Sequence, residues 1–90
     1  MMSDIPKKLA SNGEVTDNEI CRVGMIAELD AVNLYEQMAA AAGDPKLKEV
    51  LLDIAKEEKT HMGEFQAMLL KGDRQQVTEL EAGRKEVEKA

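Results

Sequence analysis

Residues 51–70, LLDIAKEEKTHMGEFQAMLL, are the stretch from which the fold can be predicted. Apolar residues recur in it at steps of three and four, the period of a helix with one buried face. Two polar residues, Glu58 and His61, interrupt that face. A three-residue step leaves both side chains on one side of the helix, about 4.5 Å apart along its axis. Because a buried carboxylate and imidazole are costly unless something satisfies them, this pair is the first candidate site.

The same period decides between neighbouring glutamates. Glu57 is also within reach of His61, at a four-residue step, but it lies about 100° away from the apolar face. Glu64 lies off the face on the other side, and we expect it in solvent. A Glu-x-x-His pair on an inward helix face is typical of carboxylate-bridged di-metal helix bundles. Glu58 and His61 are therefore candidate metal ligands.

Length and composition limit the class of protein. A chain of 90 residues with one Phe, one Tyr and no Trp has little to build a core from, so we expect it to gain stability by association. The net charge of −6 argues against nucleic-acid partners. The single cysteine, Cys21, excludes an intrachain disulfide and fits a reducing compartment. No apolar run reaches membrane-spanning length and no signal-peptide pattern opens the chain, so we expect a cytoplasmic protein without membrane contacts.

The chain divides into three segments. Residues 1–15 mix Pro, Gly, Ser and Asn without any period, and we expect them to be irregular. Residues 16–72 predict a helical hairpin, because two helical patterns are joined by a tight turn at which Gly43 can adopt the left-handed conformation. Residues 73–90 predict a C-terminal helix with a thin apolar stripe. The predicted fold class is all-α.

The first helix of the hairpin repeats the anomaly of the second. Its inward face contains Glu28, with Tyr35 two turns later. Glu28 precedes the turn at Gly43 by about 15 residues and Glu58 follows it by about 15, so antiparallel helices bring them to one height. One chain then supplies one Glu and one Glu-x-x-His, half of the four-helix set of a di-metal bundle. A symmetric pair of chains would complete it, so we predict dimerisation into a four-helix bundle.

Two readings of this cluster compete. A buried Glu paired with a His is a common structural ion pair, and the hairpin would then be a non-catalytic oligomerisation module. Three potential ligands at one height in a small core favour a metal site instead. Iron suits carboxylate and imidazole ligands, and the same ligands also accept Mn or Zn.

Three motifs resemble the encapsulated ferritin family over about residues 20–71: ELDA at 28–31 followed by Tyr35, DPKLK at 44–48 and EEKTH at 57–61. The resemblance implies a ferritin-like, rubrerythrin-like di-iron protein. It implies a ferroxidase that oxidises Fe(II) with oxygen at a di-iron centre between two subunits. Glu28, Glu58 and His61 would be the iron ligands, with Tyr35 beside the centre. It further implies a ring-shaped homodecamer carried as cargo inside an encapsulin shell, a cytoplasmic nanocompartment in which iron is stored.

The chain departs from this family in places. Members often carry carboxylates on both sides of the first-helix ligand, forming an outer site for metal uptake. This chain has Ala27 and Asp30 there, so Asp30 alone would form a weak uptake site. Residues 86–90, EVEKA, lack the usual shell-targeting ending. The nearest enzymatic alternative is a rubrerythrin-like di-iron peroxidase, which the lack of rubredoxin-type cysteine pairs disfavours.

Overall fold

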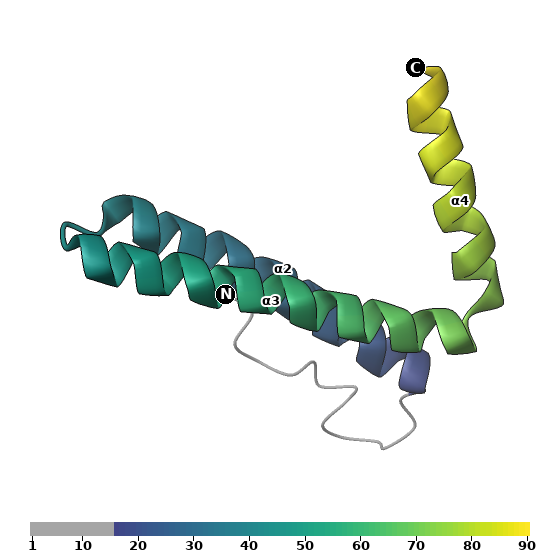
Figure 1. Cartoon of the computed structure of the whole chain (residues 1–90). Coiled ribbons are helices and arrows are strands. Elements are labelled where there is room, and N and C mark those ends of the chain that lie inside the picture. The colour runs from purple at the N-terminus through teal and green to yellow at the C-terminus, as the bar shows by residue number, and fades with distance from the viewer. Residues whose placement is uncertain (1–15) are drawn as a thin grey trace.

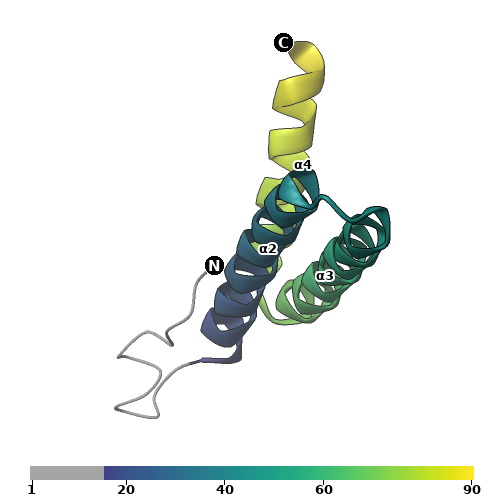
Figure 2. The same ribbon diagram turned by 90° about the vertical axis from the view of Figure 1, so that its left-hand side faces the viewer.

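Two long antiparallel helices and a third, diverging helix make up the part of the chain that the computed structural model describes, residues 16–90. They are α2 (Asp17–Ala41), α3 (Pro45–Gly72) and α4 (Arg74–Lys89). In Figures 1 and 2, α2 and α3 lie side by side as a hairpin, and α4 turns away from the far end of α3. No strand occurs within residues 16–90, so the all-α prediction is confirmed. The predicted irregular segment 1–15 lies outside the described residues.

Side chains that precede each helix fix where it begins. The Thr16 Oγ1 atom accepts a hydrogen bond from the Glu19 N–H at 3.2 Å. Asp44 Oδ1 accepts one from the Lys46 N–H at 3.0 Å, and Pro45 occupies the first turn of α3. These caps satisfy backbone donors that have no partner inside the helix. The turn differs from the prediction, because Gly43 is not in the left-handed region. Instead α2 ends where Ala42 becomes extended, at φ −69° and ψ 132°.

Small residues build the interface between α2 and α3. Ala31, Ala39 and Ala55 are almost completely buried, at 1%, 1% and 2% exposure, and short side chains let two helices approach closely. Val32, Leu51 and Leu69 are buried as well, but other large apolar residues lie outside this seam. Met68, one of the apolar residues of the 51–70 stretch that we expected on the buried face of α3, is 57% exposed, and Ile20 on α2 is 46% exposed. The reason is that each helix of a single hairpin has only one long neighbour, which covers only part of its apolar face.

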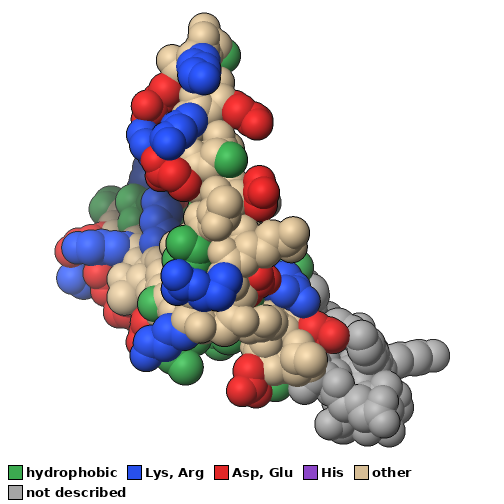
Figure 3. All heavy atoms as spheres, turned by 90° about the vertical axis from the view of Figure 1, so that its right-hand side faces the viewer, with side chains coloured by type: hydrophobic (Ala, Val, Ile, Leu, Met, Phe, Trp, Pro, Cys, Tyr) green, Lys and Arg blue, Asp and Glu red, His purple; other side chains and the backbone are tan. Residues whose placement is uncertain are grey.

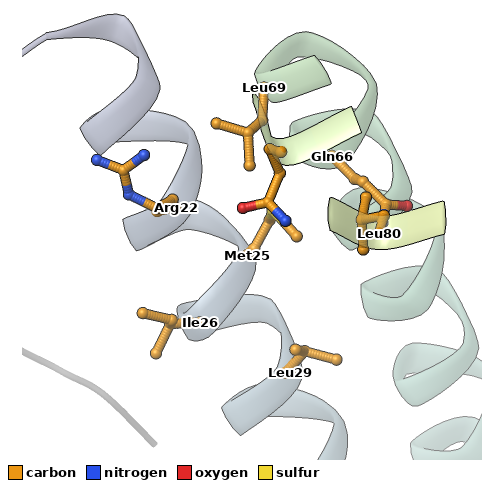
Figure 4. Close-up of a pocket in the computed structure, with 8 residues that line it drawn as sticks. Arg22, Met25, Ile26, Leu29, Gln66, Leu69 and Leu80 are labelled. Carbon is orange, nitrogen blue, oxygen red and sulfur yellow. The ribbon is translucent and has the colours of Figure 1, made fainter. Parts of the chain in front are cut away.

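The end of α3 holds α4 at an angle to the hairpin. Arg22 Nη1 on α2 lies 3.6 Å from Asp73 Oδ2, and Asn18 Nδ2 donates a hydrogen bond to the Gly72 carbonyl at 3.1 Å. The α4 helix itself has no buried residue and is lined by charged side chains (Figure 3). Its Leu80 faces Met25 and Leu69 across a hollow of about 240 Å³ in the corner of the three helices (Figure 4).

Candidate metal centre

Glu28, Glu58 and His61 come together at mid-height of the hairpin. The α2 helix supplies Glu28 and α3 supplies the other two, three residues apart on one face. His61 Nδ1 lies 3.4 Å from Glu28 Oε2 and 3.6 Å from Glu58 Oε2. One potential ligand atom from each residue falls within 4.8 Å of the others. The sequence prediction that these three residues share one height agrees with this geometry.

The cluster is buried on one side and open on the other. The side chains of Glu28 and Glu58 are 19% and 20% exposed, whereas that of His61 is 46% exposed. An open hollow of about 410 Å³ lies beside them, lined also by Glu64, Phe65 and Met68. The ligands therefore point toward a surface that solvent, or another molecule, can reach.

The carboxylates have too few partners for their burial. Glu28 Oε2 is buried and accepts no hydrogen bond. No lysine or arginine within residues 16–90 pairs with Glu28 or Glu58, so His61 is their only basic neighbour there. A buried carboxylate oxygen without a donor costs free energy. Two carboxylates and an imidazole at this spacing are hard and intermediate ligands that fit a divalent cation such as Fe(II), Mn(II) or Zn(II).

The electrostatics of the cluster favour extra positive charge. The pKa of Glu28 is raised above 4.5, because its protonated form can donate to Glu58, because burial disfavours the charged form, and because the Glu58 charge repels a second one. Burial alone would lower the pKa of His61. The charges of Glu28, Glu58 and Glu64 outweigh this effect and raise that pKa above 6.5. Both raised pKa values mean that, when no metal is bound, Glu28 and His61 hold their protons more tightly than free side chains do.

Two predicted residues lie outside the cluster. Tyr35 is half-buried on α2, seven residues and so about 10 Å along the helix from Glu28. Asp30 is half-buried and projects from another side of α2 than Glu28. Sequence reasoning also gave no role to Glu64. That residue is exposed, as expected, but it lines the hollow beside the cluster and its charge acts on His61. The signal was its three-residue step from His61, the same step that separates Glu58 from His61.

A helical hairpin with an inward Glu on one helix and Glu-x-x-His on the other defines a ferritin-like class of protein. The comparisons with known proteins agree. The chain belongs to the EncFtn-like family, whose profile matches residues 6–87. The predicted resemblance to encapsulated ferritins is therefore confirmed.

Two relatives show how far the similarity extends. The chain is 58% identical over 69 residues to a protein named "Ferritin-like-encapsulin shell fusion protein" from Pyrococcus furiosus (strain ATCC 43587 / DSM 3638 / JCM 8422 / Vc1). This match covers 77% of the chain but 20% of the relative, so the chain spans about a fifth of that protein's length. The crystal structure of the encapsulated ferritin domain from Pyrococcus furiosus superposes with a TM-score of 0.84 at 47% identity, covering 99% of this chain and 94% of that chain. Across residues 16–90, no helix has the length and apolarity needed to cross a bilayer.

Proposed function

We propose that the chain is a ferroxidase, which oxidises Fe(II) to Fe(III) with oxygen at a di-iron centre shared by two copies. One observation carries this proposal: Glu28, Glu58 and His61 converge within 4.8 Å at an open face, with a buried carboxylate oxygen that lacks a donor. Iron is both the substrate and the occupant of this site. Membership of the EncFtn-like family supports the choice of iron.

Two copies are needed because one chain supplies half a centre. Bundles that hold two metal ions use one Glu from each of two helices and Glu-x-x-His from each of two others. A two-fold axis beside His61 would bring a second, identical set of ligands and give four carboxylates and two imidazoles. Exposed Met68 lines the hollow beside the cluster, and exposed Ile20 lines the neighbouring hollow at the open end of the hairpin. Both supply apolar surface for this contact.

The ligand set suits the chemistry. Four carboxylates would balance the charge of two Fe(II) ions, and the imidazoles fill further positions without adding charge. Bound iron would supply one-electron redox chemistry, with oxygen as the electron acceptor. The chain's own residues hold and orient the metal. Glu28 and His61 lose their protons when the metal binds, so the metal takes the place of those protons in the cluster.

Further parts of the proposal come from the family rather than from the geometry. We propose that Tyr35 lies beside the assembled centre and that Asp30 is a weak outer uptake site. We also propose that dimers close into a homodecameric ring, and that this ring is enclosed in a cytoplasmic encapsulin nanocompartment where iron is stored. The relative named as a ferritin-like fusion to an encapsulin shell protein supports shell association.

The test is aerobic Fe(II) oxidation followed by ferric absorbance. Wild-type protein should be faster than buffer, and Glu58→Ala and His61→Ala should fall to the buffer rate. Glu57→Ala is the matched control, because Glu57 is an exposed glutamate outside the cluster. A Glu58→Ala variant as fast as Glu57→Ala would refute the proposal. Peroxide supplied in place of oxygen distinguishes a rubrerythrin-like peroxidase, which would turn over faster with peroxide.

The distances of 3.4 and 3.6 Å from His61 to the carboxylates also fit a structural ion pair. On that reading the hairpin is a non-catalytic oligomerisation module. Metal analysis separates the two functions. Protein reloaded with iron should hold about one iron per chain if a two-iron site is shared by two chains, and none if the cluster is only an ion pair.

A further inference from the structure

A glycine and a phenylalanine face each other one turn away from the metal cluster. Gly24 precedes Glu28 by four residues on α2, and Phe65 follows His61 by four residues on α3. Because the helices are antiparallel, both offsets run in the same direction along the hairpin. Gly24 and Phe65 therefore lie at one height, directly next to the level of the ligands.

The Phe65 ring occupies the space that a side chain at position 24 would fill. A Cβ atom there would lie 2.7 Å from Cδ1 and Cε1 of Phe65 and 2.8 Å from Cδ2. Carbon atoms in contact are normally about 3.5–4.0 Å apart. Since three ring carbons would be too close at once, the body of the ring, and not only its tip, lies against the backbone of α2. Only glycine admits the ring in this position.

The ring is also a wall of the site. Phe65 lines the hollow that contains Glu28 and His61, and it lines a second hollow with Ile20 and Cys21 at the open end of the hairpin. It therefore separates the cluster from that open end. An apolar wall of this kind limits the access of water to the ligands and so strengthens their interaction with a cation.

We infer that Gly24 and Phe65 form a positioning pair for the metal cluster. Glycine admits the ring, and the seated ring sets the separation of α2 and α3 at which Glu28 reaches a metal held by Glu58 and His61. Interiors are close-packed, so a displaced ring moves the helices, whereas ligand distances in a metal site lie within about 0.2 Å of their normal values. This role rests on the proposed function, because it presumes that the cluster holds metal.

Gly24→Leu is the variant that tests the pair. Leucine has a higher helix propensity than glycine, so any loss must come from the clash with Phe65 and not from the helix itself. Gly63→Leu is the matched control on α3, because a Cβ at Gly63 would have nothing within 4 Å. Gly24→Leu combined with Phe65→Ala tests rescue, since the smaller side chain makes room for the larger one.

The measurement is titration with Co(II), followed through its visible absorption, which reports both affinity and ligand geometry. Gly24→Leu should weaken Co(II) binding by about tenfold or more and shift the absorption band, the range seen when a partner of a metal ligand is lost. Gly63→Leu should match wild type in both. The double variant should recover most of the affinity and the wild-type band, because the clash between position 24 and the Phe65 ring is then gone.

Several results would overturn the inference. A folded Gly24→Leu variant with wild-type affinity and spectrum does so, and so does a folded double variant that recovers neither. If Gly24→Leu does not fold, Phe65→Ala alone decides: unchanged Co(II) binding and spectrum refute the role of the ring. If wild-type protein binds neither Co(II) nor Fe(II), both the proposed function and the positioning role of Gly24 and Phe65 are refuted. If wild-type protein binds metal and Gly24→Leu binds it equally well, only the positioning role is refuted.

Discussion

Replacing Glu28 by glutamine should stabilise the metal-free protein and weaken metal binding at the same time. Glu28 Oε2 is buried without a hydrogen-bond donor, close to the charge of Glu58. Glutamine keeps the shape of the side chain but removes the charge, and its amide can donate to Glu58. The substitution therefore relieves a cost that the metal-free site carries and removes a ligand that the metal needs.

The size of the stabilisation follows from the burial of Glu28. A buried polar group without a partner costs roughly 1–3 kcal/mol. The Glu28 side chain is 19% exposed, so the lower end applies, about 1 kcal/mol. In a domain of this size that corresponds to a rise of about 4–8 °C in Tm. Loss of one ligand should weaken metal binding by about 10-fold or more.

The assay is thermal unfolding followed by circular dichroism. Chelated protein is compared at one protein concentration, because association contributes to apparent stability. A pH of about 9 lies well above the ordinary imidazole pKa of 6.5 and so weakens the ion pair of His61 with Glu28 in the comparison. The exposed glutamate Glu57 supplies the control, Glu57→Gln, which should leave both Tm and metal affinity unchanged. A Glu28→Gln variant that melts below wild type would refute the reasoning, because Glu28 would then be a stabilising structural carboxylate.

Three further predictions concern pH, packing and surface charge. The pKa values of Glu28 and His61 are raised in the folded protein, so the protonated form of each residue stabilises the metal-free protein. This stabilisation is complete below the ordinary pKa values of 4.5 and 6.5, and it is lost as the pH rises through the raised pKa values. The Tm of chelated protein should therefore fall from pH ~5 to pH ~8, and this fall should shrink in His61→Ala; an equal fall in that variant would contradict the assignment. Ala55→Leu, at a position 2% exposed, should cost about 1–3 kcal/mol of unfolding free energy by forcing α2 and α3 apart, whereas Ala67→Leu, at an exposed alanine of the same helix, should not. Arg84→Ala removes the exposed ion pairs of Arg84 with Glu81 and Glu88 and should leave Tm unchanged, and a clear drop would show that α4 depends on them.

The helices and the cluster could be predicted because both depend on the spacing of residues that lie close together in the sequence. Thr16, Asp44 and Asp73 act on backbone donors two or three residues away, so their effect is visible in the sequence. Glu58 and His61 interrupt an apolar face at a helical step. Glu28 could be matched to them because a hairpin with a tight turn fixes which residues lie at equal height.

The remainder depended on contacts between distant residues. The seat of Phe65 against Gly24 joins residues far apart in sequence, and a glycine in a helix gives no sign of which side chain fills its space. The contact of Arg22 with Asp73, which helps to hold α4, is equally remote. The apolar period also could not tell which residues α2 and α3 bury against each other and which, like Met68, they leave exposed.

The central claim is that metal joins two chains at a shared site. In a metal-free dimer four carboxylates would crowd one small space, so some must be protonated or the contact must loosen. Metal removes this repulsion and bridges helices of two chains, so its binding free energy adds to association. Size-exclusion chromatography with light scattering and iron analysis, with and without anaerobic Fe(II), measures this directly. Chelated protein should run as monomer or loose dimer, and Fe(II) should convert wild type, but not Glu58→Ala, into a larger closed ring with about one iron per chain. If chelated wild type and Glu58→Ala both run as the same stable ring as iron-loaded wild type, the claim is wrong.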